Sequence, residues 1–411
     1  MDKATAQLYR EREKRFIDAV QLKVPDRVPT SLHLSYLPAR FAGITFKDAY
    51  YDFPKWKEAY IKTALYFQPD RCEFFPNQSG RVLEAMEAKT SVWPGHGAGI
   101  NSSHQFVECE YMKAEEYDLF LNDQSDFNIR YLNPRTYGLL EPLAKLPPLE
   151  SMQSFIPYNV LATPEFANLL QKISGIAREA VEWQKLNQGM IDEMNELGFP
   201  GRTAMVGGGV PYDMISDFMR GMKGAMLDMY RCPDKLLAAI EKVSQQTLKR
   251  IAAAPKAKGF TTAFIALHRG ADGFMSLKQF ELFYWPYLMK LVNALVDAGY
   301  TPEIFFEGDY TQRLEYLLEL PKGKVIGRFD RTDMAKVKEV LGGHICIEGN
   351  VPASLLQTSD VEGVKKYCKW LIDVVGKDGG YIMGPGSVVD EVKIENLKAM
   401  IDFTHEYGKY R

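Results

Sequence analysis

Two acidic side chains, spaced two residues apart, follow an apolar run in the second half of the chain. The segment is Phe305-Phe306-Glu307-Gly308-Asp309, and it has the pattern of a buried β-strand that ends in a turn. Side chains of a strand alternate between its faces, so Glu307 and Asp309 project to the same side as Phe305. Ionised carboxylates at such a place are costly unless they meet a metal, a cation or a substrate. A turn cap, or a surface ion pair with Arg313, is the alternative role.

Other apolar segments of the same half end in charged or polar residues at comparable points. Where such segments are parallel strands of one barrel, their ends converge, and the side chains there can form one coordination sphere or one acid/base cluster. A histidine with two or three carboxylates suits zinc or a harder divalent ion. The expected metal ligands are His268, Glu307, Asp330 and Glu348. We expect His268, Glu307 and Asp330 also to act in catalysis.

Each of these assignments has a plainer alternative. His268 would then only hydrogen-bond a neighbouring loop, and Arg269 and Arg328 would neutralise the carboxylates as structural ion pairs without a metal. Cys346 lies within a predicted strand and is interpreted as a small core residue. The run Gly207-Gly208-Gly209 follows a predicted strand and could cradle a phosphate, but it lacks the spacing and the lysine of a phosphate-binding loop, so it is a weak signal.

Short apolar runs that alternate with amphipathic stretches must position these residues. The strand candidates are 27–31, 70–75, 202–206, 261–267, 302–306, 324–329, 344–348 and 380–383. Helical stretches such as 275–298, 310–320 and 361–375 separate them. Alternation of this kind is typical of βαβ units with a parallel sheet, and eight strands favour a (β/α)₈ TIM barrel over an open sheet.

Residues 77–200 interrupt this alternation and are interpreted as a capping insertion after the second strand, within a single barrel that spans 1–411. The segment 93–104 is rich in aromatic, glycine and histidine residues, which predicts one wall of the barrel mouth and movement between open and closed forms. The expected substrate-binding residues are Asn77, Trp93, His96, Arg269 and Arg328.

Composition limits the class of protein. The chain has 411 residues, 46% hydrophobic and 25% charged, with a net charge of −3, so neither nucleic acid nor an anionic membrane surface is an expected partner. No apolar run is long enough to span a bilayer, and the glutamates in the mixed-charge segment 9–16 argue against a transit peptide. Five scattered cysteines without a Cys-x-x-Cys pattern predict reduced thiols and a cytoplasmic location.

Five segments, in this order, resemble the uroporphyrinogen decarboxylase superfamily. They are 209–235, 276–286, the turn Glu348-Gly349-Asn350-Val351-Pro352, 379–382 and 395–400. The resemblance covers 200–411 well and the N-terminal part loosely. This superfamily also contains methyltransferases that pass methyl groups to and from corrinoid proteins, and it implies a (β/α)₈ barrel.

Departures from the family patterns indicate the branch. Decarboxylases of the family carry an arginine-rich loop after the first strand and an aspartate after the second, whereas 32–40 holds one arginine and the second strand leads into Asn77. A tetrapyrrole with eight carboxylates needs several cations, so porphyrinogen activity is expected to be lost. The coenzyme M methyltransferases hold zinc with a His-x-Cys pair and a further Cys, and the matching positions are Phe305, Glu307 and the region of Gly386. A thiol acceptor is therefore not expected.

The resemblance and the oxygen-rich side chains together imply a corrinoid-dependent, O-demethylating methyltransferase. Such an enzyme moves a methyl group from a small methoxylated compound, in most cases aromatic, to cob(I)alamin on a partner protein, and polarises the leaving oxygen. The expected cofactors are zinc and the cobalamin of the partner corrinoid protein, and a homodimer is left open. Two alternatives remain: a decarboxylase whose small substrate is clamped by Arg269 and Arg328, and a non-catalytic corrinoid-binding subunit.

Overall fold

The computed structural model describes residues 2–73, 77–152, 157–201, 203–204 and 206–410. Within them, parallel strands recur along the chain with helices between them. These strands are β1 (Ser31–His33), β2 (Arg71–Glu73), β6 (Thr203–Ala204), β7 (Thr262–Leu267), β8 (Thr301–Phe306), β9 (Ile326–Phe329), β10 (Cys346–Glu348) and β11 (Tyr381–Ile382). Each of them overlaps or adjoins one of the eight predicted runs, and the predicted α/β class is confirmed.

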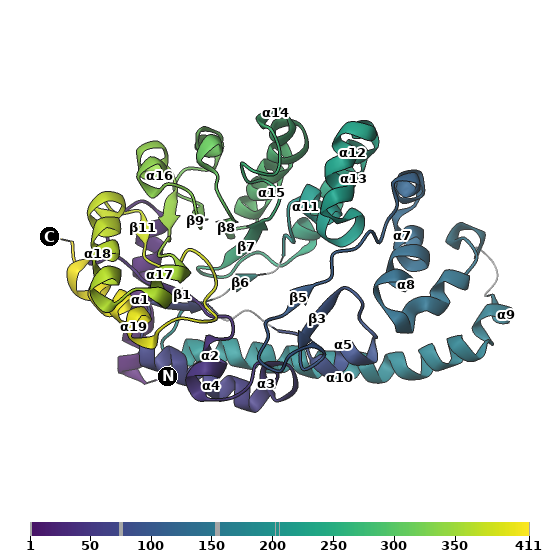
Figure 1. The fold of residues 1–411 in the computed structure, drawn as a ribbon, viewed down its shortest axis with the longest axis horizontal. Coiled ribbons are helices and arrows are strands. Elements are labelled where there is room, and N and C mark those ends of the chain that lie inside the picture. Colours follow the sequence, from purple (N-terminus) through teal and green to yellow (C-terminus); the bar gives the residue numbers. More distant parts are fainter. Residues whose placement is uncertain (1, 74–76, 153–156, 202, 205, 411) are drawn as a thin grey trace.

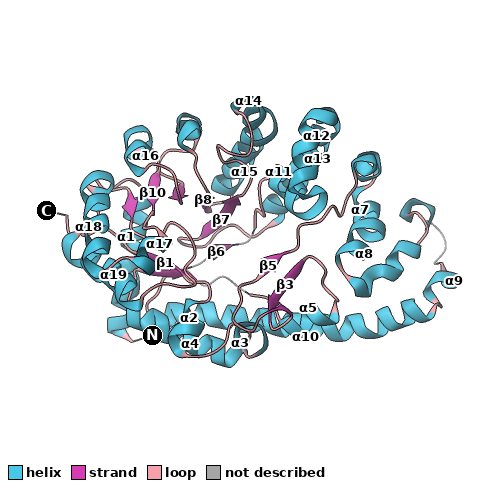
Figure 2. Ribbon diagram, viewed as in Figure 1, coloured by secondary structure: helices cyan, strands magenta, loops and turns pink. Residues whose placement is uncertain are grey.

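The strands pair in chain order. Strands β6 to β11 form one parallel sheet in the order β11-β10-β9-β8-β7-β6, and β1 pairs with β2. A parallel bridge between Thr30 and Met383 joins the β1 edge to the β11 edge, so the sheet curves back on itself (Figure 2). Consecutive parallel strands in this order, with helices outside, have the architecture of a TIM-type barrel. Parts of the predicted strands 70–75 and 202–206 lie outside the described residues.

Helices surround the sheet (Figure 1). The outer ones include α4 (Phe53–Phe67), α13 (Pro233–Ala253), α15 (Trp285–Asp297), α16 (Met334–Leu341), α18 (Val361–Leu371) and α19 (Ile394–Tyr407). Helix α1 (Lys3–Val20) packs Phe16 and Val20 against the first interior residues of the barrel, among them Ile326 and Cys346. Cys346 is fully buried there, in agreement with a core residue.

Two predicted helices have irregular turns. The stretch 275–298 consists of α14 (Leu277–Gln279), the π-helical turn η6 (Phe280–Tyr284) and α15. Pro286 has no backbone N–H to continue the ladder, so the helix starts again at this point. The stretch 310–320 is the 3₁₀ helix η7 (Thr311–Glu319) instead of an α-helix.

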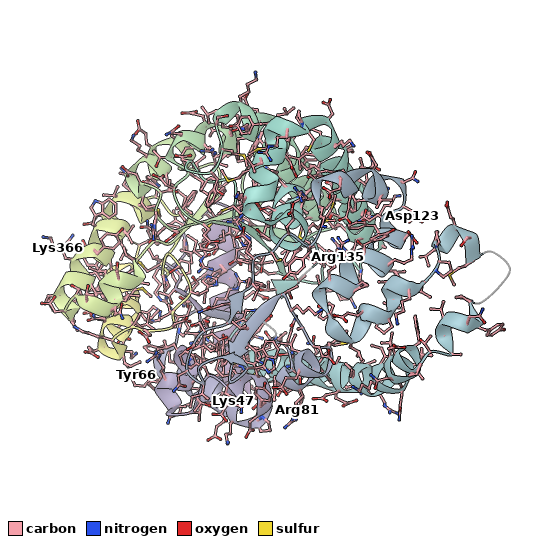
Figure 3. All side chains as sticks on the ribbon, turned by 45° about the vertical axis from the view of Figure 1, so that its right-hand side comes forward. Lys47, Tyr66, Arg81, Asp123, Arg135 and Lys366 are labelled. Carbon is pink, nitrogen blue, oxygen red and sulfur yellow. The ribbon has the colours of Figure 1, made fainter. Side chains whose placement is uncertain are left out.

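The connection between β2 and β6 is long. It contains α5 (Gly80–Ala85), a small sheet of β3 (Ser91–Pro94), β4 (Gly97–Ala98) and β5 (Gln105–Phe106), and short helices that include α6 (Tyr117–Asn122), α7 (Gln124–Phe127) and α8 (Asn133–Thr136). It then returns through the long helix α10 (Pro164–Glu196), which runs below α5 and past α4 in Figure 1. A bidentate ion pair joins Arg135, which is labelled in Figure 3, to Glu116 and links the short helices of this connection. Both contacts are 2.7 Å long.

Candidate active site at the barrel mouth

A cavity of about 560 Å³ lies at the carboxyl ends of β7, β8 and β9. Each of these strand ends contributes a pair of neighbouring residues, and three phenylalanines form the apolar part of the wall. The lining residues are Phe106, Glu108, Asp217, Phe218, His268, Arg269, Phe274, Glu307, Gly308, Asp330 and Arg331. The structure therefore brings four of the predicted site residues, His268, Arg269, Glu307 and Asp330, to one cavity.

His268 is held by a carboxylate that the sequence analysis did not single out. Its Nδ1 lies 2.5 Å from Oδ2 of Asp217, and its Nε2 lies 3.9 Å from Oε2 of Glu307. The hydrogen bond to Asp217 raises the pKa of His268 above its ordinary value against the opposing effect of burial, and the charges of Asp213 and Glu307 act in the same direction. The imidazole is thus biased toward its protonated form, with Nε2 facing Glu307.

A second aspartate fixes the backbone at this point. The buried carboxylate of Asp213 accepts hydrogen bonds from the backbone N–H of His268 (3.0 Å) and of Arg269 (3.1 Å), and from the hydroxyl of Tyr284 (2.6 Å). Burial raises the pKa of Asp213 to about 6. Asp213 therefore fixes the backbone at the end of β7, and His268 is held by its backbone N–H as well as by its side chain.

Glu307 and Asp309 have different roles. The side chain of Glu307 is 54% exposed and lines the cavity, whereas Oδ1 of Asp309 accepts a hydrogen bond from the N–H of Thr311 (2.9 Å). The turn-cap alternative therefore applies to Asp309. Between them, Gly308 has a φ of +95°, which favours glycine, and its N–H donates to Oδ2 of Asp330 (3.3 Å). Burial raises the pKa of Asp330.

The two predicted arginines are separated. Arg269 lines the cavity, and its Nη2 lies 3.0 Å from Oδ1 of Asp217. Arg328 is buried inside the barrel, where its guanidinium lies 4.6 Å from the centroid of the Phe305 ring. Arg328 is absent from the described cavity wall, which instead contains the exposed Arg331.

Glu348 also lies below the mouth. Its Oε1 accepts hydrogen bonds from Ser31 (2.5 Å) and from Nε2 of His33 (2.7 Å). In the strand register, Glu348 pairs with Arg328, which pairs with Phe305, so Glu307 lies two residues nearer the mouth. The structure thus separates Glu348 from the other three expected metal ligands.

Glu348 belongs instead to an interior group with His33 and Glu303, whose potential ligand atoms all lie within 4.8 Å of one another. Arg71 donates to Glu303 (2.8 Å). Burial works to raise the pKa of Glu348, but the charges of His33 and Arg328 and the hydrogen bonds from His33 and Ser31 lower it to about 2. Arg71 and Arg328 also act on the two carboxylates, so the group is part of a buried ion-pair network as well.

The predicted residues of the insertion lie away from the mouth cavity. Trp93 is fully buried, stacks on His96 with ring centroids 4.4 Å apart, and donates from Nε1 to the hydroxyl of Tyr51 (3.0 Å). His96 is half exposed, 3.4 Å from Glu84. A large aromatic side chain is more stable against other rings than at an open rim, and this part of the insertion reaches the cavity through Phe106 and Glu108.

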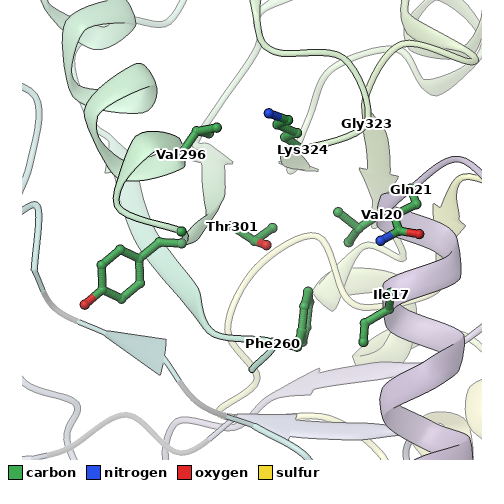
Figure 4. Close-up of a pocket in the computed structure, with 10 residues that line it drawn as sticks. Ile17, Val20, Gln21, Phe260, Val296, Thr301, Gly323 and Lys324 are labelled. Carbon is green, nitrogen blue, oxygen red and sulfur yellow. The ribbon is translucent and has the colours of Figure 1, made fainter. Parts of the chain in front are cut away.

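Two further cavities differ in character. Asn77 lines one beside the mouth, and its backbone carbonyl accepts hydrogen bonds from Trp183 (3.1 Å) and Asn187 (2.9 Å). The other, of about 240 Å³, lies at the opposite end of the barrel between α1 and the start of β8, where Phe260 faces Ile17 (Figure 4). It contains none of the predicted site residues.

The mouth has part of the ligand set that zinc requires. A catalytic zinc takes three protein ligands, and its histidines donate their other ring nitrogen to a carboxylate or carbonyl. His268 meets this second condition through Asp217, and its Nε2 lies 3.9 Å from Glu307. Asp330 lines the same cavity and is the remaining candidate. Within the described ranges, no helix combines the length and apolar character needed to cross a bilayer.

Comparisons with known proteins assign the second half of the chain to a family. Residues 196–407 match the family described as Uroporphyrinogen decarboxylase (URO-D). A uroporphyrinogen decarboxylase of Geobacter sulfurreducens is 26% identical over 217 residues, which cover 51% of this chain and 62% of that protein. One of Flavobacterium johnsoniae is 25% identical over 272 residues, covering 63% and 74%.

A solved structure is similar over nearly the full length. A methyltransferase from Methanosarcina mazei superposes with a TM-score of 0.60 over 96% of this chain and 98% of its own, at 15% identity. At this identity the likeness indicates a shared fold and supports the TIM-type barrel.

Proposed function

This chain belongs to the uroporphyrinogen decarboxylase family, and within that family we propose that it is an O-demethylating methyltransferase. It would take the methyl group of a small methoxylated compound, in most cases aromatic, and pass it to the cob(I)alamin of a partner corrinoid protein. The observation that carries this proposal is the Asp217–His268 pair, which faces Glu307 in a cavity with aromatic walls.

The chemistry of methyl removal needs a proton at the leaving oxygen. When the methyl–oxygen bond of an ether breaks, its electron pair remains on oxygen, and an acid at that atom lowers the barrier. Asp217 accepts from Nδ1 of His268 and raises the pKa of the ring, which favours a second proton on Nε2 for the leaving oxygen. The products are a hydroxy compound and a methyl group transferred to the corrinoid, which supplies the nucleophile.

The remaining cavity residues would position the substrate and exclude water. Phe106, Phe218 and Phe274 offer apolar surfaces to a ring, and the carboxylate of Glu307 orients the imidazole or the substrate hydroxyl. Phe106 is 74% exposed and Phe218 is 41% exposed, so the rim also presents apolar surface to a bulky, flat corrinoid on a partner.

A zinc ion is the alternative to the proton of His268 as the group that would stabilise the leaving oxygen. His268 and Glu307 would hold it, with Asp330 as the third ligand, and it would act as a Lewis acid on the leaving oxygen. A zinc ion requires the neutral imidazole, so it competes with the proton that Asp217 favours.

Decarboxylation is the rival function, because the matched family and the curated relatives bear that name. The charges of the cavity speak against a porphyrinogen. Its wall carries four carboxylates, Glu108, Asp217, Glu307 and Asp330, against two arginines, Arg331 and Arg269, and Arg269 is already paired with Asp217. Clamping a small carboxylate with Arg269 and Arg328 is also disfavoured, since Arg328 is buried inside the barrel.

A single experiment separates these functions. The purified protein is incubated with a panel of methoxyarenes and reduced corrinoid protein, and the hydroxyarene is measured by chromatography. Parallel samples contain the matching carboxylated arenes, and released carbon dioxide is measured. The proposal expects hydroxyarene that depends on the corrinoid. Carbon dioxide without hydroxyarene would establish the decarboxylase, and neither product, with corrinoid protein bound, would establish the non-catalytic subunit.

A further inference from the structure

A second cavity, which we name the aromatic cavity, lies beside the mouth. It has a volume of about 330 Å³ and lies between the segment after β1, the helices α3 (Asp48–Tyr51) and α4, and the insertion. Five of its described lining residues carry rings: Tyr36, Tyr50, Trp56, Tyr60 and His104. Its other walls include Ala49, Asn77, Gln78 and Val388.

The wall carries no formal charge. None of the described residues that line the aromatic cavity is an aspartate, glutamate, lysine or arginine. Burial lowers the pKa of His104, so its ring is neutral near pH 7. An ionised ligand would lose its hydration here without gaining an ion pair, which is costly, whereas an uncharged ring loses little. The charged mouth cavity next to it has the opposite character.

Polar groups on this wall can orient a ligand. The hydroxyl of Tyr50 lies 3.0 Å from that of Tyr36 and 3.1 Å from Nδ1 of His104. The indole N–H of Trp56, on a side chain that is only 5% exposed, has no acceptor within the described part of the chain. Buried donors are nearly always satisfied by protein, water or ligand, so this donor is available to an acceptor that a ligand brings into the cavity.

The size limits the ligand further. An engineered apolar cavity of roughly 150 Å³ is enough to bind benzene. A cavity of about 330 Å³ therefore has room for one ring with one or two small substituents. The ring of His104 contacts that of Phe106 edge-on, with centroids 5.0 Å apart, so the aromatic cavity and the mouth cavity share a wall.

We propose that the aromatic cavity binds an uncharged, single-ring aromatic compound that carries an oxygen acceptor. The binding claim stands on the cavity alone. The methyl donor of the proposed function lies at His268 in the mouth cavity, so the compound bound here is a second ligand beside it.

Calorimetry with two probes tests whether the aromatic cavity prefers an uncharged ligand to a charged one. We expect wild-type protein at pH 7 to bind 2-methoxyphenol at least tenfold more tightly than 4-methoxybenzoate. Gln78 is exposed and lines the cavity, so Gln78→Arg adds a cation with little risk to folding. That variant should bind 4-methoxybenzoate roughly tenfold more tightly than wild type, a gain typical of one charge-assisted contact. Equal or tighter binding of 4-methoxybenzoate by the wild type would overturn the proposal.

Steric variants test the location. Val388 is 49% exposed at the rim of the aromatic cavity, so Val388→Phe should fill it from outside and lower the affinity for 2-methoxyphenol at least tenfold. Val107 is 41% exposed and lines neither cavity, which makes Val107→Phe the matched control. Unchanged binding by a folded Val388→Phe variant would place the ligand elsewhere and overturn the proposal. Normal binding without methyl transfer would contradict only the proposed function.

Discussion

Oδ2 of Asp217 lies 2.5 Å from Nδ1 of His268, although the two residues come from different strand–helix connections. Asp217 lies in the π-helical turn η5 (Ser216–Arg220), and His268 directly follows β7. A carboxylate can only accept, so this contact fixes a proton on Nδ1 and leaves Nε2 to the cavity. The position of Asp217 therefore decides what His268 can do as an acid.

Replacing Asp217 by Asn should change the pH dependence of methyl transfer. Under the proposed function the acid form of His268 is the active one, so the rate is expected to fall as pH rises through its pKa. Without the negative charge that pKa returns toward its ordinary value, and the fall should occur at lower pH. The rate at pH 7 should drop about tenfold to a hundredfold. Rates of the variant and of the control Asp126→Asn, which alters a pair with Arg130 in the insertion, are measured from pH 5 to 9. An unshifted profile would remove the acid role of His268.

Glu307→Gln should lower methyl transfer by about 10² or more, on the scale of one lost transition-state contact, and leave the thermal unfolding temperature unchanged. The side chain is 54% exposed in the cavity, so folding does not depend on it. Steady-state rates are compared with those of Glu315→Gln, an exposed glutamate in η7 outside the cavity. Wild-type turnover by the Glu307 variant would exclude it from the mechanism.

The alternation of strands and helices predicts both the barrel and part of its mouth. Hydrophobic runs with helices between them indicate parallel strands, and carboxyl ends of parallel strands meet at one face, so His268, Glu307 and Asp330 could be placed together. The depth of a residue depends on strand register, which the pattern does not contain, and Glu348 lies lower for that reason.

Asp213 and Asp217 were missed because they belong to a connection. Strand β6 is described over two residues, and the two aspartates follow it in the short helix α11 (Pro211–Ile215) and in η5. Their spacing of four residues, which puts both on one face of a helix, is the signal that could have found them. Tertiary packing of Tyr284 and His268 onto that face has no local signature.

If zinc completes the site, its binding should depend on the residues of the mouth cavity and not on the interior group of His33, Glu303 and Glu348. We expect His268→Ala to lose bound zinc, measured by elemental analysis after dialysis against zinc, while Glu348→Gln keeps it, because Glu348 is hydrogen-bonded to His33 and Ser31 inside the barrel. Zinc retention should weaken below the raised pKa of His268, since the proton and the metal compete for Nε2. Loss of zinc only in the Glu348 variant would assign the ion to the interior group.

Glu348→Gln should instead reduce stability, with a defined pH dependence. The folded pKa of Glu348, about 2, lies below its ordinary value of 4.5, so its ionisation stabilises the fold above pH 4.5, and this contribution is lost as pH falls toward 2. Removing one partner of a buried ion pair costs about 3 kcal/mol. Chemical denaturation should show a lower free energy of unfolding for the variant at pH 7, and a difference from wild type that shrinks between pH 4.5 and 2. A constant difference over that range would contradict the low pKa.

Docking of the corrinoid protein should depend on Phe106 rather than on Trp93. The sequence pattern predicts Trp93 at the mouth, but its ring is buried against His96 and its N–H is bonded to Tyr51, so it cannot touch a partner. Phe106, 74% exposed at the rim of the mouth cavity, can. Exposed aromatic side chains are typical anchors of interfaces, and truncating one costs more than 1 kcal/mol.

We expect Phe106→Ala to raise the KM for the corrinoid protein by about tenfold, which is more than it raises the KM for the methoxyarene. Trp93→Phe removes the hydrogen bond to Tyr51 and should lower the unfolding temperature without a selective effect on the KM for the corrinoid protein. The comparison of the two variants separates a contact with the partner from support of the fold. If Trp93→Phe raised that KM selectively and Phe106→Ala did not, the partner would approach the barrel from a different side of the insertion.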